Sequence, residues 1–494
     1  MSQEMGTRGS VVYYPPKVWT DDFMQKQTSV YLGEKYSERA AKLKENVREM
    51  LENVKKASSD QLELIDVVQR LGLSYHFNRE IQQILASLHT MMNNNVEQKN
   101  ENLCKTALQF RLLRQEGYQV SQDIFKGFIN EEGKFDMKLC GNTKGMLSLY
   151  EASYLTMEDE HILEMAKEFT THHLKQTLKQ AGIDQNMGEQ VSHALEMPLH
   201  WRMKRLETRW FIDVWHESVN LAERMDFARS RLVEGFLWSV GFTPEPQFEY
   251  CRKISTKSAE LITVIDDICD IHATLHEVEI MADAVKRWDI NALEELPNYT
   301  KICFLALFNY VNEWSDLCET YLVEAKWYNN GITPSLKEYL ENALVSISGP
   351  LLILQAYISI ANPIKMEDLQ HLVTYPSIIR YPSLILRLTD DLGTSPDEMA
   401  RGDTSKSIQC YMQETGRSED EAHNMMREMV EATWKKMNKE ILMDTHFCRD
   451  YVQTAMNLAR ISQCMYQYGD GYGRPDGVTK DRIKSLFFQP IPLP

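Results

Sequence analysis

The sequence has little glycine and proline for its length, with 22 and 16 residues in 494. A turn-rich all-β fold needs more of both, because these residues supply most tight turns. Basic residues are also scarce relative to acidic ones, at 54 Lys and Arg against 71 Asp and Glu, so the formal net charge is −17. This balance argues against a general nucleic-acid binder, which needs clustered Lys and Arg for phosphate contacts.

Cysteine is sparse, with nine residues scattered singly between Cys104 and Cys464 and none in a Cys-x-x-Cys pair. In a chain of this size the pattern predicts reduced thiols in an intracellular protein. The first ten residues have neither the apolar run of a signal peptide nor the many arginines of a transit peptide. We therefore expect a cytoplasmic protein. The alternative is the chloroplast stroma, for a chain trimmed of its leading segment.

One run without charged residues, from Asn342 to Ile364, is long enough to cross a bilayer. Serines interrupt it, and Gly349 and Pro350 break it near its start. We expect no membrane span but a buried, kinked helix, because a Gly-Pro break frees backbone carbonyls that can face a cavity.

Apolar residues recur at helical spacing along nearly the whole chain, separated by short loops. Gly72, for example, follows an amphipathic run that includes Leu64, Val68 and Leu71, as expected for a helix end. There is no Rossmann glycine fingerprint, no P-loop and no strand–turn–strand series. The predicted fold class is all-α. Because paired acids, arginines and aromatics become denser after residues 200–220, we predict two helical domains, 1–215 and 216–494.

A first acidic cluster contains Asp266, Asp267 and Asp270 and follows an apolar lead-in. Asp266 and Asp270 share one face of a helix, where like charges destabilise it unless a positive group lies between them. Buried unpaired carboxylates are costly, and hard Mg²⁺ or Mn²⁺ suits oxygen-only ligands. The alternative for this segment alone is a solvated acidic patch.

A second cluster places Asp390, Thr394 and Glu398 four residues apart, so that they form one stripe of oxygens on a helix. Pro396 predicts a kink that makes the position of Glu398 less certain than the other two. A hydroxyl among carboxylates is typical of metals that also hold a phosphate. The alternative is a surface loop.

Cationic side chains flank both clusters: Arg229 and Arg231 precede the first, Arg387 precedes the second and Lys406 follows it. Arginine binds phosphate oxygens bidentately and lysine adds a point charge. Each of the four could instead be an ordinary surface charge, and only their combination with the acids indicates an anion site.

Aromatic residues supply the remaining element. Trp238 lies just after the arginine pair, and Tyr466, Tyr468 and Tyr472 cluster near Asp470. The face of an aromatic ring can stabilise a cation in a dry pocket. Core packing is the alternative for each of them.

Taken together, these motifs resemble the plant class I terpene synthases over essentially the whole chain. The resemblance begins with PPKVW ending at Trp19. The further motifs that carry it are RSR at Arg229–Arg231, DDICD at Asp266–Asp270, DDLGTSPDE at Asp390–Glu398, RGDTSKSIQCYM at Arg401–Met412 and YQYGDGYG at Tyr466–Gly473.

The resemblance implies a C-terminal class I helical bundle that holds the active site. It also implies an N-terminal, α-barrel-like relic domain whose leading segment caps that site. Three Mg²⁺ ions are implied, with Mn²⁺ as a possible substitute, and the implied metal ligands are Asp266, Asp267, Asp270, Asp390, Thr394 and Glu398. The implied catalytic and diphosphate-binding residues are Arg229, Arg231, Trp238, Arg387, Lys406, Asp470 and Tyr472.

The implied activity is ionisation of geranyl or farnesyl diphosphate with release of diphosphate, by a monomer or weak homodimer. Cyclising monoterpene members carry tandem arginines before the leading tryptophan segment, where this chain has Gly9 and Ser10. We therefore expect acyclic alcohols, linalool or nerolidol. The alternatives are a cyclising mono- or sesquiterpene synthase and a shortened, inactive relative that binds prenyl diphosphate without turnover. A prenyl chain-elongating synthase is disfavoured, because its second motif would be another DDxxD.

The segment between Trp215 and Arg229 is only 13 residues long, whereas the family carries additional helical structure there. We interpret this as a deletion beside the bundle that holds the active site. It favours the inactive alternative, although the metal and diphosphate residues are all retained.

Overall fold

The computed structural model describes eleven stretches of the chain, and every structural statement below concerns these stretches. They are residues 34–53, 59–94, 102–179, 184–209, 232–267, 274–287, 315–361, 363–400, 404–443, 446–474 and 477–489.

The described residues divide into two compact helical units. The larger unit comprises residues 232–437 and 446–484, and the smaller unit comprises residues 34–209, 438–443 and 485–489. Apart from one isolated bridge between Ile129 and Phe135, these residues contain no β-structure. The all-α class and the two-unit organisation are thus confirmed. The predicted boundary at residues 215 and 216 falls outside the described residues and stays a prediction.

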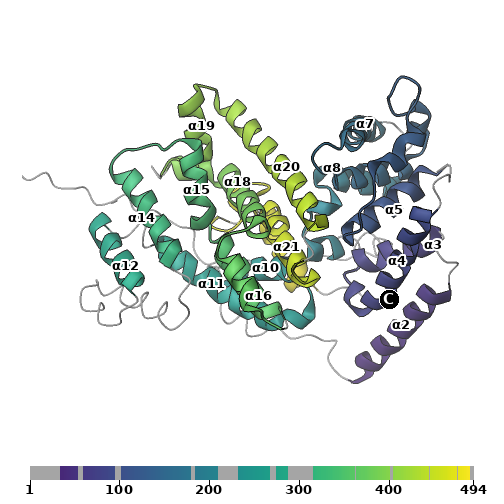
Figure 1. Cartoon of the computed structure of the whole chain (residues 1–494), viewed down its shortest axis with the longest axis horizontal. Coiled ribbons are helices and arrows are strands. Elements are labelled where there is room, and N and C mark those ends of the chain that lie inside the picture. The colour runs from purple at the N-terminus through teal and green to yellow at the C-terminus, as the bar shows by residue number, and fades with distance from the viewer. Residues whose placement is uncertain are drawn as a thin grey trace, which may run out of the picture. The chain divides into compact units, whose positions relative to one another are not determined.

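The smaller unit is built on one buried helix, α5, against which α3, α4 and α6 pack. Leu112 and Leu113 of α5 are fully buried, and Gly72 after α3 has a positive φ of 64°, as a helix-ending glycine requires. The helices, drawn from purple to blue in Figure 1, are α2 Glu34–Asn53, α3 Ser59–Arg70, η1 Ser74–His76, α4 Asn78–Asn94, α5 Leu103–Gln115, η2 Gln122–Phe128, η3 Met137–Gly141, α6 Thr143–Ser153, α7 His161–Thr177, α8 Gln185–Glu196 and η4 Leu199–Trp201.

The larger unit is organised around α18, which packs against α21, α16, α15 and α19. Helix α21 also contacts α10 and α16, and α11 joins α10 and α16, so these helices enclose a common interior. Its helices are α10 Leu232–Phe242, η5 Pro246–Phe248, α11 Glu249–Asp267, α12 Leu275–Arg287, α14 Ser315–Asn329, α15 Leu336–Ser346, α16 Gly349–Ile360, α17 Met366–Leu372, α18 Ser377–Ala400, α19 Ser407–Thr415, α20 Glu419–Met443, α21 Arg449–Tyr466 and α22 Gly477–Phe487.

The uncharged run forms α15 and α16, which are separated by a break at Ser348. Ser348 adopts a left-handed φ of 64°, and Pro350 lies in the first turn of α16, where its missing N–H costs no helical hydrogen bond. The stretch Leu336–Ile360 is long and apolar enough to span a membrane, but 67% of its most apolar window is buried inside the protein. The predicted buried, broken helix is confirmed.

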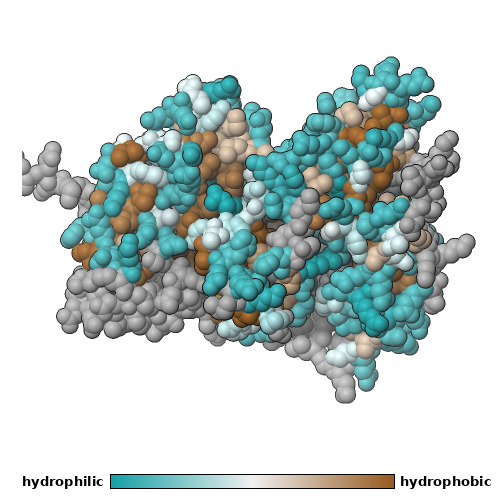
Figure 2. Space-filling model, viewed as in Figure 1, coloured by the Kyte–Doolittle hydropathy of each residue, from teal (hydrophilic) through white to brown (hydrophobic). Residues whose placement is uncertain are grey.

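Helix α18 runs through two internal prolines, Pro382 and Pro396, without ending. Side chains around it are packed closely: a Cβ added to Gly349 of α16 would lie 2.7 Å from the Cβ of Ser383. At Gly349 and Ser383, α16 and α18 therefore approach each other through small residues. On the face seen in Figure 2 most of the described surface is hydrophilic, with hydrophobic residues in separate patches.

Candidate active site

A pocket of about 190 Å³ opens inside the larger unit. Its lining comes from α10, α11, α14, the break between α15 and α16, α18, the start of α19, α21 and the loop that follows α21. The predicted site residues that line it are Trp238, Arg387, Asp390, Thr394, Glu398, Lys406, Asp470 and Tyr472. These predicted residues come from four separate segments of the sequence, which thus meet in one cavity.

The second acidic motif forms the stripe that its spacing predicts. Asp390, Thr394 and Glu398 all face the pocket from α18, and the Thr394 hydroxyl donates to Glu398 Oε2 at 2.9 Å. Pro396 does not end the helix. The helix continues to Ala400, and Glu398 keeps its place on the stripe.

Two cations lie directly against this stripe. The guanidinium of Arg387 contacts Asp390, and it also approaches Asp391 Oδ1 at 2.6 Å. The Lys406 ammonium lies 3.7 Å from Glu398 Oε2. Burial opposes the charge of Arg387, but the neighbouring carboxylates outweigh it and raise its pKa well above the ordinary value. The buried end of the pocket therefore holds permanent positive charge, as an anion site requires.

The oxygen stripe fits a divalent metal. Burial raises the pKa of Asp390 to about 7, despite the lowering effect of Arg387, so an ionised Asp390 needs more positive charge nearby. Two carboxylates and a hydroxyl are hard oxygen donors of the kind that Mg²⁺ prefers. In the stretches that the structure describes, no group of three or more His, Cys, Asp and Glu side chains is placed to hold a metal ion.

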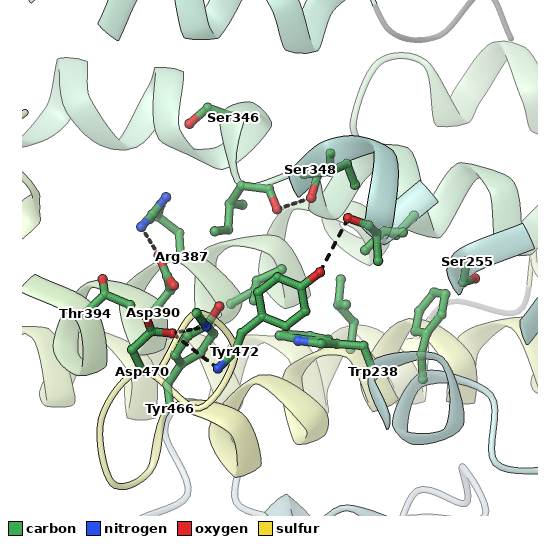
Figure 3. Close-up of a pocket in the computed structure, with 18 of the residues that line it drawn as sticks. Trp238, Ser255, Ser346, Ser348, Arg387, Asp390, Thr394, Tyr466, Asp470 and Tyr472 are labelled. Atoms are coloured by element: carbon green, nitrogen blue, oxygen red, sulfur yellow. Dashed lines mark hydrogen bonds and ion pairs between the residues drawn. The ribbon is translucent and has the colours of Figure 1, made fainter. Parts of the chain in front are cut away.

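The opposite part of the pocket is apolar and aromatic. Trp238 and Phe242 of α10 line it together with Leu352 and Leu458, and the Trp238 and Tyr466 rings lie 6.2 Å apart. In Figure 3, Arg387, Asp390 and Thr394 gather on one side, while Trp238 and Ser255 lie toward the other. The pocket thus has a charged end and a hydrophobic end.

The loop after α21 closes one side of the charged end. Asp470 Oδ1 accepts hydrogen bonds from the backbone N–H groups of Tyr472, at 3.2 Å, and Gly473, at 2.6 Å. The Tyr472 hydroxyl donates to the Ala259 carbonyl of α11 at 3.4 Å. Tyr468 of the same cluster is 49% exposed and does not line the pocket. Asp470 therefore shapes the loop, and Tyr472 ties it to α11.

Among the pocket residues, sequence reasoning missed Glu324 and gave Tyr466 no specific role. Glu324 of α14 lines the pocket and accepts from the Ser346 hydroxyl at 2.5 Å and from Asn342 Nδ2 at 3.1 Å. The sequence did contain one signal for Glu324: it is an acidic residue, three positions after Tyr321, on a helix face that is otherwise apolar. Tyr466 was noted only as an aromatic, yet burial and the nearby Asp390 carboxylate raise its pKa well above the ordinary value.

The other predicted site residues are not placed. Arg229, Arg231 and Asp270 lie outside the described residues, and of Asp266 and Asp267 only the backbone at the end of α11 is described. Gly9, Ser10 and the junction from Trp215 to Arg229 also lie outside the described residues. Their predicted roles stay predictions.

Comparison with known protein families gives two matches that together span most of the chain. The model "Terpene synthase, N-terminal domain" matches residues 18–195. The model "Terpene synthase family, metal binding domain" matches residues 217–315 and 309–436. The second family model includes α18 and its oxygen stripe.

Similar proteins agree with these matches. The (-)-alpha-terpineol synthase of Vitis vinifera is 48% identical over 534 aligned residues, which cover 97% of this chain and 90% of that protein. A crystal structure of limonene synthase with 2-fluorolinalyl diphosphate has a TM-score of 0.91 at 36% identity and covers 97% of this chain and 99% of its own. Isoprene synthase from grey poplar, with three Mg²⁺ ions and dimethylallyl-S-thiolodiphosphate, has a TM-score of 0.84 at 40% identity, covering 95% and 98%.

The comparisons also show that this chain is shortened. The alignment to the Vitis protein is 40 positions longer than the chain itself, so at least that many positions have no residue here. The metal-binding-domain model matches in two pieces that meet at residues 309–315. The match nevertheless extends along nearly the whole chain, and the chain belongs to the terpene synthase family, whose plant class I members are lyases acting on prenyl diphosphates.

Proposed function

We propose that this protein is a Mg²⁺-dependent terpene synthase that ionises geranyl or farnesyl diphosphate and closes the resulting carbocation into a cyclic product. The observation that carries the proposal is the division of one pocket into a charged end, with Arg387, Lys406 and the α18 stripe, and an apolar end, with Trp238. An allylic diphosphate has the same two parts.

Ionisation breaks the bond between C1 and the diphosphate oxygen, and both electrons leave with the oxygen. Arg387 and Lys406 are proposed to hold the departing diphosphate and to stabilise the negative charge that develops on it. The rings of Trp238 and Phe242 offer their faces to the carbocation, and the apolar wall keeps water away from it. The residues thus separate the two ions that the reaction creates.

Asp390, Thr394 and Glu398 are proposed to hold one Mg²⁺, and Asp266, Asp267 and Asp270 to hold two more. A bound Mg²⁺ supplies Lewis-acid stabilisation to phosphate oxygens. The three Mg²⁺ ions in the isoprene synthase structure support this number, and Mn²⁺ offers the same oxygen-seeking chemistry.

The comparisons favour a cyclic product over linalool or nerolidol. Terpineol and limonene, named in the similar proteins above, are ring compounds. So are the products named for gamma-terpinene synthase of Citrus limon, 45% identical over 97% of this chain and 90% of that protein, and alpha-zingiberene synthase of Ocimum basilicum, 42% identical over 97% and 98%. The acyclic-alcohol interpretation rested on Gly9 and Ser10 alone, and no product named for these proteins is linalool or nerolidol.

A second candidate is an open-chain hydrocarbon product. Myrcene synthase of Quercus ilex is 47% identical over 97% of this chain and 89% of that protein, and myrcene has no ring. Loss of a proton from the first allylic cation gives such a product without ring closure. The Quercus ilex and Citrus limon proteins are both named chloroplastic, which supports the stroma as the location.

The test is a product assay. The purified protein is incubated with geranyl diphosphate and, separately, farnesyl diphosphate in the presence of Mg²⁺, and the volatiles are identified by gas chromatography and mass spectrometry. We expect mainly cyclic products from at least one substrate. Mainly linalool or nerolidol would contradict the proposal, and so would bound substrate without any product, which is the behaviour of an inactive relative.

A further inference from the structure

Asp391 is the fully buried neighbour of Asp390 on α18, and it faces away from the pocket. Its exposed fraction is 0%, and it is absent from the pocket lining. Tyr339 of α15 donates its hydroxyl to both carboxylate oxygens, at 2.9 and 3.0 Å. A buried carboxylate needs such partners, because it has lost its hydration.

The same carboxylate reaches two groups that belong to the charged end of the pocket. Its Oδ1 lies 2.6 Å from the guanidinium of Arg387, and its Oδ2 accepts the backbone N–H of Ser407 at 3.2 Å. Ser407 is the first residue of α19 and follows Lys406 directly. Asp391 therefore joins α15, α18 and the start of α19 at one point.

This arrangement holds Arg387 and Lys406 in place from the core side, opposite the pocket. Arg387 lies between Asp390 on the pocket side and Asp391 on the core side, so its guanidinium has little freedom to turn away. Lys406 precedes the hydrogen-bonded Ser407, and its own N–H donates to Gln409 Oε1 at 3.0 Å. Gln409 in turn donates to the Ser395 hydroxyl of α18 at 2.9 Å. Asp391 thus adds a charged contact to Arg387 and a hydrogen bond to the residue after Lys406.

We propose that Asp391 is a positioning residue that holds Arg387 and Lys406 at the diphosphate end of the pocket without touching the substrate. The proposal rests on the function proposed above. Its physical basis is that fixed charges stabilise a developing anion without reorganising when the bond breaks. A guanidinium that had to be reoriented at that moment would lose part of this effect.

The test uses the variant Asp391→Asn in the full chain. Asparagine keeps the size and can still accept from Tyr339 and Ser407, but it removes the negative charge beside Arg387. We expect kcat to fall about 10- to 100-fold, as for other residues that orient functional groups without contacting the substrate themselves. We expect KM to change less than about threefold, because the interaction strengthens as the diphosphate gains charge in the transition state.

Inorganic pyrophosphate with Mg²⁺ is the second probe, measured by titration calorimetry. It resembles the departing group more than the substrate does, and its Kd should rise about tenfold in Asp391→Asn. The matched control is Asp368→Asn, since Asp368 is also buried in the larger unit and accepts from a tyrosine hydroxyl, that of Tyr357, at 2.5 Å. Asp368 does not line the pocket. In the control, kcat and the pyrophosphate Kd should stay within about twofold.

Three results would overturn the inference. They are an unchanged kcat and pyrophosphate Kd in Asp391→Asn, equal losses in the Asp368→Asn control at a matched unfolding temperature, and a wild-type chain that does not bind pyrophosphate with Mg²⁺. If Asp391→Asn does not fold, Tyr339→Phe removes only the hydroxyl that donates to the two oxygens of Asp391. It should change both quantities about threefold in the same direction, and no change would again contradict the inference. A wild-type chain that binds pyrophosphate but yields no terpene refutes the proposed function alone, and the binding comparison still decides the role of Asp391.

Discussion

At the scale of single residues, the charged end of the pocket contains buried carboxylates and cations in direct contact. Arg387 contacts two carboxylates, and Lys406 approaches a third, Glu398, at 3.7 Å. The three carboxylates outnumber the two cations, and two of the carboxylates, Glu398 and Asp391, also accept a hydrogen bond from a hydroxyl. Such a site is prepared for additional ions of both signs, a metal at the oxygens and a diphosphate at the cations.

Replacing Lys406 with methionine keeps the length of the side chain and removes the charge. We expect kcat/KM for the active diphosphate to fall about 100-fold, the scale found when one donor to a developing anion is lost. The matched control is Lys337→Met on α15, where the side chain is 85% exposed, and it should behave as wild type. Steady-state kinetics decide the matter, and equal activities of the two variants would contradict the role given to Lys406.

Sequence spacing predicted the residues of the α18 stripe because all three share one helix, whose geometry is fixed by local rules. It did not predict Glu324. That residue belongs to a helix without an acidic motif and meets Ser346 and Asn342 only after α14 packs on α15. The proposed positioning role of Asp391 could not be predicted from the sequence for the same reason, since its partner Tyr339 lies 52 positions away in the chain.

At the scale of elements, the pocket depends on the break between α15 and α16 and on the uninterrupted helix α18. The break at Ser348 was predictable, because Gly-Pro at the start of a helix is a local signal. The stripe on α18 was predicted as part of one helix with a kink at Pro396, and the helix does continue past that proline. Pro396 lies only four residues before the helix ends at Ala400, so its missing N–H removes one hydrogen bond near an end that is already incomplete.

At Gly349, α16 approaches α18 closely. In Gly349→Ala the new methyl group would lie 2.7 Å from the Cβ of Ser383 and 3.0 Å from its Cα, so the helices must separate. We expect a loss of about 1–3 kcal/mol of stability, as for other overpacked cores. The control is Gly477→Ala at the start of α22, where nothing lies within 4 Å. Denaturant unfolding measures both, and a Gly349→Ala protein as stable as the control would contradict this packing.

At the scale of the whole molecule, the net charge of −17 gave little information about the site. Most acids are solvated, whereas the functional ones are few, buried and paired with cations. The smaller unit also contains a buried acid that is paired with cations. Glu207 is buried and contacts Arg202 at 2.6 Å, Arg70 at 2.7 Å and His193 at 3.0 Å.

The Glu207 cluster makes the smaller unit sensitive to acid. Burial opposes the charge of Glu207, but Arg202 and Arg70 outweigh it and hold its pKa well below 4.5. A depressed folded-state pKa stabilises the fold fully above the unfolded value, and this stabilisation is lost as the pH falls toward the folded value. In Glu207→Gln the buried Arg202 and the half-buried Arg70 lose this carboxylate, and we expect a loss of about 3–5 kcal/mol at neutral pH.

The measurement is thermal unfolding of wild type and Glu207→Gln between pH 7 and pH 3. The difference between the two proteins should be greatest at pH 7 and should shrink below about pH 4.5, where the wild-type carboxylate begins to lose its advantage. A difference that is constant with pH would show that Glu207 acts through packing rather than charge.

The central claim is that the α18 stripe and its cations form a metal-dependent ionisation site. Pyrophosphate release from geranyl or farnesyl diphosphate tests it most directly, measured for wild type with Mg²⁺, for wild type with EDTA, and for Asp390→Asn with Mg²⁺. We predict release in the first case, none above background with EDTA and at least a 100-fold lower rate in Asp390→Asn. Release that persists in EDTA, or a wild-type rate in Asp390→Asn, would contradict the claim.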